Sequence, residues 1–170
     1  MATAFEISRA LITQGADAGN MAQVLESLTT ADSLPVWGAG AVGASLTPDE
    51  VVLIILGATA ANPEAAAEHA GKVSELIRAD GRSLGEVLTK ILGAEPSEID
   101  VLEMTVSSNG RQATIKYWRN VVSDTFSING GLSAFSPSTI IRGSLVQALA
   151  MKLSQPTTGG WVERPSGEQI

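Results

Sequence analysis

The segment around Asn109-Gly110 constrains the fold of this chain most. Asn-Gly is a strong signal for a two-residue β-hairpin loop, because both residues tolerate the positive φ of a type I′ turn. Residues 99–106 and 111–118 flank it and alternate between apolar and polar side chains. This register predicts five cross-strand pairs, the apolar ones on one face and the polar ones on the other: Val106–Ala113, Met104–Ile115, Leu102–Tyr117, Thr105–Thr114 and Glu103–Lys116.

A lone hairpin is only marginally stable in water. This one must therefore pack on helices, extend into a larger sheet or pair with another subunit. Residues 121–128 and 138–142 are predicted as a third and a fourth strand. A last helix follows, indicated by Leu145, Val146, Leu149, Met151 and Leu153.

The chain before residue 94 has helical periodicity instead. Apolar residues recur at helical spacing in two short segments, and a Gly- and Asx-rich turn at residues 14–20 joins them. The first segment has a second apolar strip at Phe5 and Ile12. Two short helices joined in this way have the outline of a helix-turn-helix, and an ordinary helical hairpin is the alternative.

Three further helices are predicted between residues 47 and 93. Thr47-Pro48-Asp49-Glu50 is a capping box with proline at the first helical position, and Ser83-Leu84-Gly85-Glu86 is a second capping box. The run 51–56 is apolar on every side, which predicts a central core helix, with a strand as the alternative. Asn62-Pro63-Glu64 opens another helix, expected to turn Val73, Leu76 and Ile77 inward and to end at Gly81.

These predictions define an α+β fold. A helical bundle with a helix-turn-helix-like hairpin comes first, followed by a small antiparallel sheet and a C-terminal helix. The expected boundaries are 1–37 for the hairpin, 38–46 for a Gly/Ala linker, 47–93 for the helical region, 99–154 for the sheet and last helix, and 155–170 for a flexible tail. A chain of 170 residues is long enough to bury a core of this kind.

The charge of the chain is distributed unevenly. Residues 1–71 contain one basic residue, Arg9, and eight acidic ones, so all of the net charge of −7 lies there. The remaining 99 residues carry ten charges of each sign. The first part would repel a phosphate backbone, so we expect weak binding or none to generic duplex DNA.

Gly38, Gly40 and Gly43 match the dinucleotide fingerprint G-x-G-x-x-G. The motif requires a strand that enters it and a helix that leaves it without a break. Here Pro35 disfavours a central strand, and a new helix begins at Thr47-Pro48. We therefore interpret the segment as a loop between helices, and a dinucleotide-binding protein that uses Gly38–Gly43 is an alternative.

No set of catalytic or metal-ligating residues stands out, so we predict no enzyme activity and no cofactor. Cysteine is absent and His69 is the only histidine, which excludes thiolate sites and paired-histidine sites within one chain. His69 is expected at the edge of the core, with a catalytic Ser/His/Asp arrangement as the alternative. No apolar run is long enough to cross a bilayer and no signal peptide is visible, so we expect a cytoplasmic protein with no membrane partner.

Four residues are the candidates for nucleic-acid contact. Asn20 and Gln23 lie on the second helix of the helix-turn-helix-like hairpin, where a DNA reader carries polar side chains. Arg111 and Lys116 lie on the β-hairpin and would supply positive charge. A solvated sheet face is the alternative for the two basic residues.

The segment from Ser33-Leu34-Pro35 to Leu46-Thr47-Pro48-Asp49-Glu50 follows two short helices. It resembles small phage and prophage proteins that have an N-terminal helix-turn-helix, a Gly-rich connector and an L-T-P-[ED] helix. The connector differs from the usual Arg-rich one, because it contains no arginine. The order of a helix-turn-helix, a helical middle and a β-rich end is also similar to phage small terminase subunits. That resemblance implies a ring-forming protein that recognises packaging DNA.

Three functions are therefore considered. The first is a non-enzymatic, homo-oligomeric phage or prophage assembly protein, with another phage or host protein or DNA as its partner. The second is an acidic inhibitor that binds a basic surface of a host nucleic-acid-binding complex. The third is the dinucleotide-binding protein described above.

Overall fold

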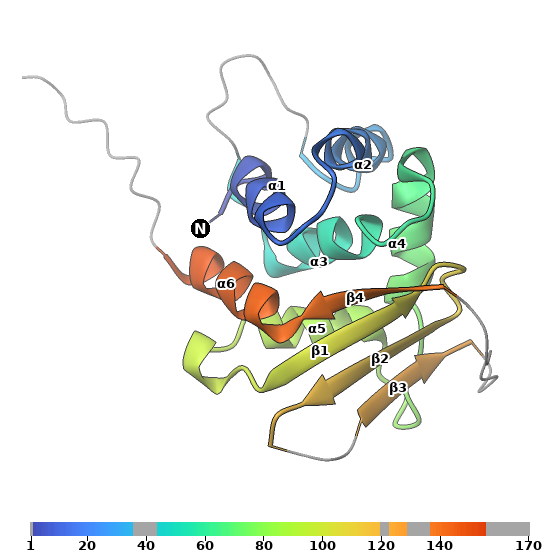
Figure 1. The fold of residues 1–170 in the computed structure, drawn as a ribbon, viewed down its shortest axis with the longest axis vertical. Coiled ribbons are helices and arrows are strands. Elements are labelled where there is room, and N and C mark those ends of the chain that lie inside the picture. Colours follow the sequence, from blue (N-terminus) through green and yellow to red (C-terminus); the bar gives the residue numbers. More distant parts are fainter. Residues whose placement is uncertain (1, 36–43, 120–122, 129–136, 156–170) are drawn as a thin grey trace, which may run out of the picture.

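The computed structural model describes residues 2–35, 44–119, 123–128 and 137–155. Within them the fold is α+β, as the sequence predicts (Figure 1). The helices are α1 (Ala4–Thr13), α2 (Ala18–Thr30), α3 (Pro48–Gly57), α4 (Ala66–Ser74), α5 (Leu84–Leu92) and α6 (Gly143–Ser154), with short 3₁₀ turns at η1 (Pro63–Ala65) and η2 (Pro96–Glu98). The strands are β1 (Val101–Ser107), β2 (Gln112–Tyr117), β3 (Ser123–Ser127) and β4 (Ser138–Arg142).

Local capping determines where the helices begin. Capping boxes start α1 at Thr3 and Glu6, α3 at Thr47 and Glu50, and α5 at Ser83 and Glu86. In each box the side-chain hydroxyl and the glutamate together satisfy two backbone N–H groups that the helix leaves without partners. The two boxes expected from the sequence are thus confirmed.

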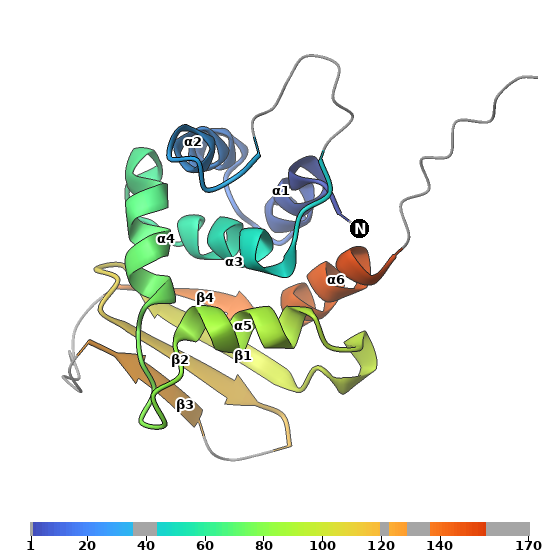
Figure 2. The same ribbon diagram turned by 180° about the vertical axis from the view of Figure 1, so that it is seen from behind.

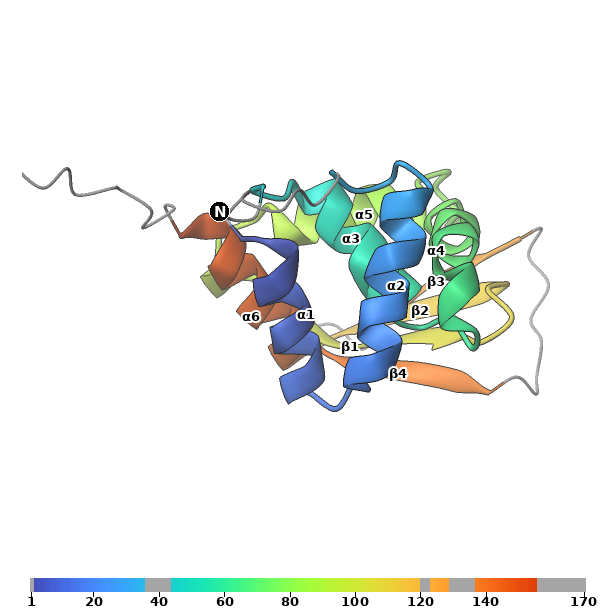
Figure 3. The same ribbon diagram turned by 90° about the horizontal axis from the view of Figure 1, so that it is seen from above.

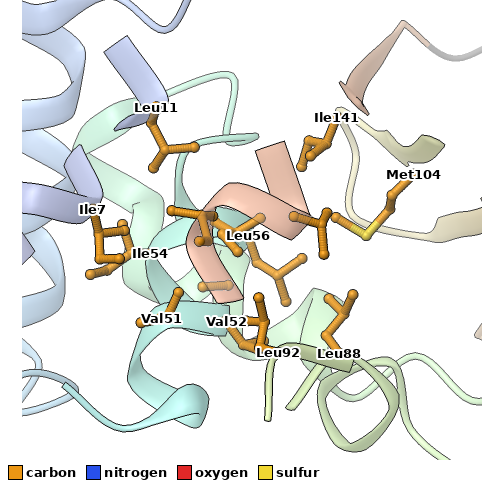
Figure 4. Packing of buried hydrophobic residues seen from close by; sticks show 14 of the residues in the cluster. Ile7, Leu11, Val51, Val52, Ile54, Leu56, Leu88, Leu92, Met104 and Ile141 are labelled. Carbon is orange, nitrogen blue, oxygen red and sulfur yellow. The ribbon is translucent and has the colours of Figure 1, made fainter. Parts of the chain in front are cut away.

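Helix α3 lies at the centre of the core. Five of its apolar residues are almost fully buried: Val51, Val52, Ile54, Ile55 and Leu56. Figure 4 shows side chains of α3 in one cluster with Ile7 and Leu11 of α1, Leu88 and Leu92 of α5, and Met104 and Ile141 of the sheet. One hydrophobic cluster therefore joins the helical part to the sheet, and it includes Leu46 from the end of the predicted linker.

The second apolar strip of α1 does not join this core. The Phe5 side chain is 65% exposed and Ile12 is 37% exposed, whereas Ala4, Ile7 and Leu11 are buried. A helix as short as α1 buries one face against its neighbours, and here that face is the strip of Ala4, Ile7 and Leu11.

The four strands form one antiparallel sheet in the order β3-β2-β1-β4. Helices α5 and α6 pack behind the sheet, as the view from behind shows (Figure 2). No described element covers the opposite face, which points toward the viewer in Figure 1. The hairpin is therefore stabilised both by a larger sheet and by helices.

The predicted hairpin register is correct for four of its five pairs, from Glu103–Lys116 to Val106–Ala113. The fifth is wrong, because an irregularity between Val101 and Glu103 pairs Tyr117 with Val101 instead of Leu102. This bulge places Val101, which is 4% exposed, on the core side of the strand. A bulge shifts the alternation by one residue, so a regular pattern could not predict it.

The predicted type I′ turn is also wrong. Gly110 has a φ of +66°, but Asn109 does not adopt positive φ. The Gly110 N–H donates to the Ser107 carbonyl, and the Asn109 side chain accepts hydrogen bonds from the Ser107 hydroxyl and the Arg111 N–H. The asparagine thus stabilises a wider loop with its side chain rather than with a left-handed backbone.

Helix α4 ends at Ser74, before the predicted end at Gly81. Ile77 is 54% exposed and forms isolated bridges with Ser83 and with Ser127 at the end of β3. Gly81, with a φ of +85°, lies in the tight turn that reverses the chain between these residues. The expectation that Ile77 points inward is wrong. The backbone of Ile77 pairs with Ser127 of β3 instead of continuing the α4 helix, and this leaves its side chain exposed.

Candidate functional site

An acidic groove is a large hollow on the described surface. Its volume is about 930 Å³, and it lies between α2 and the segment of η1 and α4. We define the acidic groove by its lining residues: Gln23, Glu26, Ser27, Thr30, Ala31, Ser33, Asn62, Glu64, Ala65, Ala67 and Glu68. Three of these are glutamates and none is a lysine or an arginine.

A single hydroxyl joins the two walls of the groove. Ser27 Oγ on α2 donates to the Glu64 carbonyl oxygen at 2.9 Å and accepts from the Ala67 N–H at 3.2 Å. Helix α3 contacts both walls at Gly57, because a Cβ added there would lie 3.2 Å from Val24 Cγ1 of α2 and 3.5 Å from Ala66 Cβ of α4. The two walls are therefore held at a fixed separation.

The carboxylates of the groove differ in their partners. Glu68 forms an exposed ion pair with Lys72 one turn further along α4, and the hydrogen bond from that lysine lowers the pKa of Glu68. Glu26 and Glu64 form no ion pair within the described part of the chain, and their side chains accept no hydrogen bond there. The groove therefore presents uncompensated negative charge to a ligand.

The candidate DNA-contacting residues fall in two separate regions. Asn20 and Gln23 are both exposed on α2, and Gln23 lines the acidic groove beside Glu26. Arg111 lies in the loop between β1 and β2, and Lys116 lies on the open face of the sheet. The Lys116 Nζ is 2.6 Å from Glu103 Oε1. Neither of these two basic residues lines the groove with Gln23.

His69 is a half-buried histidine at the junction of α4 with the hairpin loop. The Thr59 hydroxyl lies 2.9 Å from His69 Nε2 and donates its own proton to the Leu56 carbonyl at 2.7 Å. Nε2 must therefore carry a hydrogen and donate it to Thr59. Burial, and secondly Lys72, lower the pKa of His69. These contacts place His69 at the edge of the core, as predicted, with the Thr59 hydroxyl as its side-chain hydrogen-bond partner.

An ionic cluster ties the Ile77–Ser83 turn to the edge of the sheet. Arg78 forms ion pairs with Asp80 and with Asp124 of β3, and Tyr117 Oη donates to Asp124 Oδ2 at 2.9 Å. Burial, followed by the Asp124 carboxylate, raises the pKa of Tyr117 above its ordinary value of 10.0. All the charges of this cluster are paired, so we assign it a structural role.

The Gly-rich motif lies outside the described residues. Gly38, Gly40 and Gly43 fall in residues 36–43, so the dinucleotide hypothesis stays a prediction. Among described residues, no group of three or more acidic, histidine or cysteine side chains could hold a metal ion. No helix within the same ranges has the length and hydrophobicity needed to cross a membrane.

The chain was compared with known protein families, curated proteins and solved structures, and none of them matches. The resemblance to phage proteins thus stays a hypothesis.

The acidic groove was only partly evident in the sequence. The charge asymmetry of residues 1–71 pointed to this part of the chain, and Glu64 and Glu68 share a helix face. Glu26 lies far from them along the chain and comes close only because α2 packs against η1 and α4. No local pattern could have linked it to the other two.

Proposed function

We propose that this protein is a non-enzymatic binding protein whose acidic groove takes a basic segment of another protein. The single observation that carries the proposal is the pair of carboxylates, Glu26 and Glu64, that form no ion pair among the described residues and line the acidic groove. A partner that brings lysine or arginine would supply the missing counter-charges. Such complementarity mainly increases the association rate and the specificity of a complex.

The charge of the surrounding surface supports this choice over DNA recognition. Residues 1–71 carry a net charge of −7, and the groove has no lining cation. Binding to DNA depends on the neutralisation of phosphates by cations. The charged residues that line the groove with Gln23 are all glutamates, which would repel phosphates. An inhibitor that competes with nucleic acid for a basic protein surface is one form of this function. Phage origin and homo-oligomeric assembly remain hypotheses alongside it.

The test measures binding of a labelled basic peptide to matched charge variants. The probe is a fluorescein-labelled 16-residue peptide of four Lys-Ala-Ala-Arg repeats, measured by anisotropy at about 0.15 M salt. Glu26→Gln combined with Glu64→Gln removes two charges from the groove. Glu95→Gln combined with Glu98→Gln removes two charges from the exposed η2 segment and serves as the control.

We expect the groove variant to bind the peptide more weakly and the control to bind like the wild type. Exposed ion pairs contribute about 0.2–1 kcal/mol each, so two of them correspond to a loss of roughly 2- to 30-fold in affinity. An equal loss in both variants would show that net charge alone attracts the peptide. That result, or no binding by the wild type, would contradict the proposal.

A further inference from the structure

At the outer edge of β4, backbone groups of Ile140 and Arg142 have no hydrogen-bond partner among the described residues. The Ser108 N–H donates to the Pro137 carbonyl, and the register pairs Val106 with Thr139 and Met104 with Ile141. In an antiparallel ladder the backbone groups of alternate residues point to opposite sides. The N–H and C=O of Ile140 and the N–H of Arg142 therefore point away from β1, and no described residue forms a hydrogen bond with them.

A second hollow runs along this same edge. It has a volume of about 630 Å³ and lies between β4, the connection from α1 to α2, and the end of α3. We call it the edge groove. Its apolar floor includes Leu11, Ile55 and Leu145, which are buried, whereas Thr139 is exposed although it occupies a helix-facing position of the sheet. Seen from above, the α1–α2 connection lies over the outer side of β4 (Figure 3).

We propose that the edge groove binds an extended peptide segment of another protein, which adds to the sheet as a fifth strand beside β4. Main-chain hydrogen bonds to Ile140 and Arg142 would supply the pairing, and alternate side chains would enter the apolar floor. This inference does not depend on the acidic groove, which lies between α2 and α4.

The charge of the edge groove selects the kind of peptide. Arg142 is the only charged residue among those that line it, and no ion pair between described residues includes its side chain. The partner segment is therefore expected to carry a carboxylate opposite Arg142. A second copy of this chain fits less well, because the α1–α2 connection of each copy would lie over the shared edge.

Substitution of Ile140 by proline tests hydrogen bonding at the outer edge of β4 without disturbing the pairing of β4 with β1. The Ile140 N–H points outward, so Ile140→Pro removes a donor to the added strand and leaves the β1–β4 ladder with its donors. Arg142→Gln tests the charge with no backbone change, and Arg111→Gln is its control at an exposed site in the hairpin loop. Together these variants keep the test valid if the proline variant does not fold.

The probe is a fluorescein-labelled peptide of sequence Ser-Val-Thr-Val-Glu-Val-Thr, measured by anisotropy with the full chain. We expect Ile140→Pro to lose binding at least 10-fold, Arg142→Gln to lose it roughly 1.4- to 5-fold, as for one exposed ion pair, and Arg111→Gln to leave it unchanged. A peptide with lysine in place of the glutamate should bind more weakly. Amide hydrogen exchange should slow at Ile140 and Arg142 when the peptide is bound.

Three results would overturn the inference. The first is the absence of binding by the wild type to the acidic peptide. The second is binding that neither Ile140→Pro nor Arg142→Gln reduces. The third is a wild-type dimer in sedimentation that Ile140→Pro converts to a monomer, since the occupant of the edge would then be a second copy.

Discussion

Replacement of Gly143 by alanine should severely destabilise the fold. Gly143 begins α6 directly after β4, and a Cβ at this position would lie 1.7 Å from the Val101 carbonyl oxygen and 2.9 Å from that of Leu102. An ordinary C···O contact is about 3.3 Å or longer. The two carbonyls belong to the bulge of β1, so no side-chain rotation can relieve the overlap. The backbone of β1 or of α6 must move.

The magnitude follows from the kind of atoms that collide. Overpacking of a well-packed interior costs about 1–3 kcal/mol, and backbone collisions lie at the upper end of that range. For a domain of this size, 1 kcal/mol lowers Tm by about 2–4 °C. We therefore expect Gly143→Ala to unfold about 6–12 °C below the wild type. Circular dichroism at 222 nm and urea titration measure the loss.

Gly71→Ala is the matched control for this substitution. Gly71 lies within α4, and a Cβ there would meet nothing within 4 Å. Alanine favours a helix over glycine by roughly 0.5–1 kcal/mol, so this variant should be slightly more stable than the wild type. A Gly143→Ala protein that melts within about 2 °C of the wild type would refute the close approach of α6 to the β1 bulge.

Three further predictions concern the polar contacts around the sheet. Tyr117 is the only tyrosine, so absorbance near 295 nm follows it alone, and Asp124→Asn should lower its pKa because the negative charge beside the phenol is lost. The pKa of His69 is lowered in the folded protein, so the unfolded chain binds a proton at this residue more readily, and stability should fall as the pH drops below the ordinary pKa of 6.5. His69→Gln keeps a donor toward Thr59 but does not titrate. Urea titrations between pH 5 and 8 should therefore show a weaker pH dependence of stability for this variant. Gly110→Ala should cost about 1–2 kcal/mol in the same titrations, because φ is +66° and a Cβ would lie 3.3 Å from Val73 Cγ2. An unchanged Tyr117 titration, an equal pH dependence in both His69 forms or a wild-type midpoint for Gly110→Ala would contradict the respective contact.

The sequence by itself determined the features that depend on neighbouring residues. The capping boxes at Thr47 and Ser83 satisfy backbone groups three residues away, so their residue types are enough to place the starts of α3 and α5. The hairpin follows from alternation and from Asn109-Gly110, which fix the register close to the loop. The α+β class follows from the change of periodicity between the two halves.

Only the tertiary structure decided the features that depend on distant residues. The α4 helix stops early because Ile77 pairs with Ser127, and the β1 bulge exists where α6 approaches Val101. The acidic groove unites Glu26 with Glu64 through the packing of α2. Contacts of this kind are selected by the free energy of the whole core, to which each local segment contributes only a part, and so no window of sequence contains the information that specifies them.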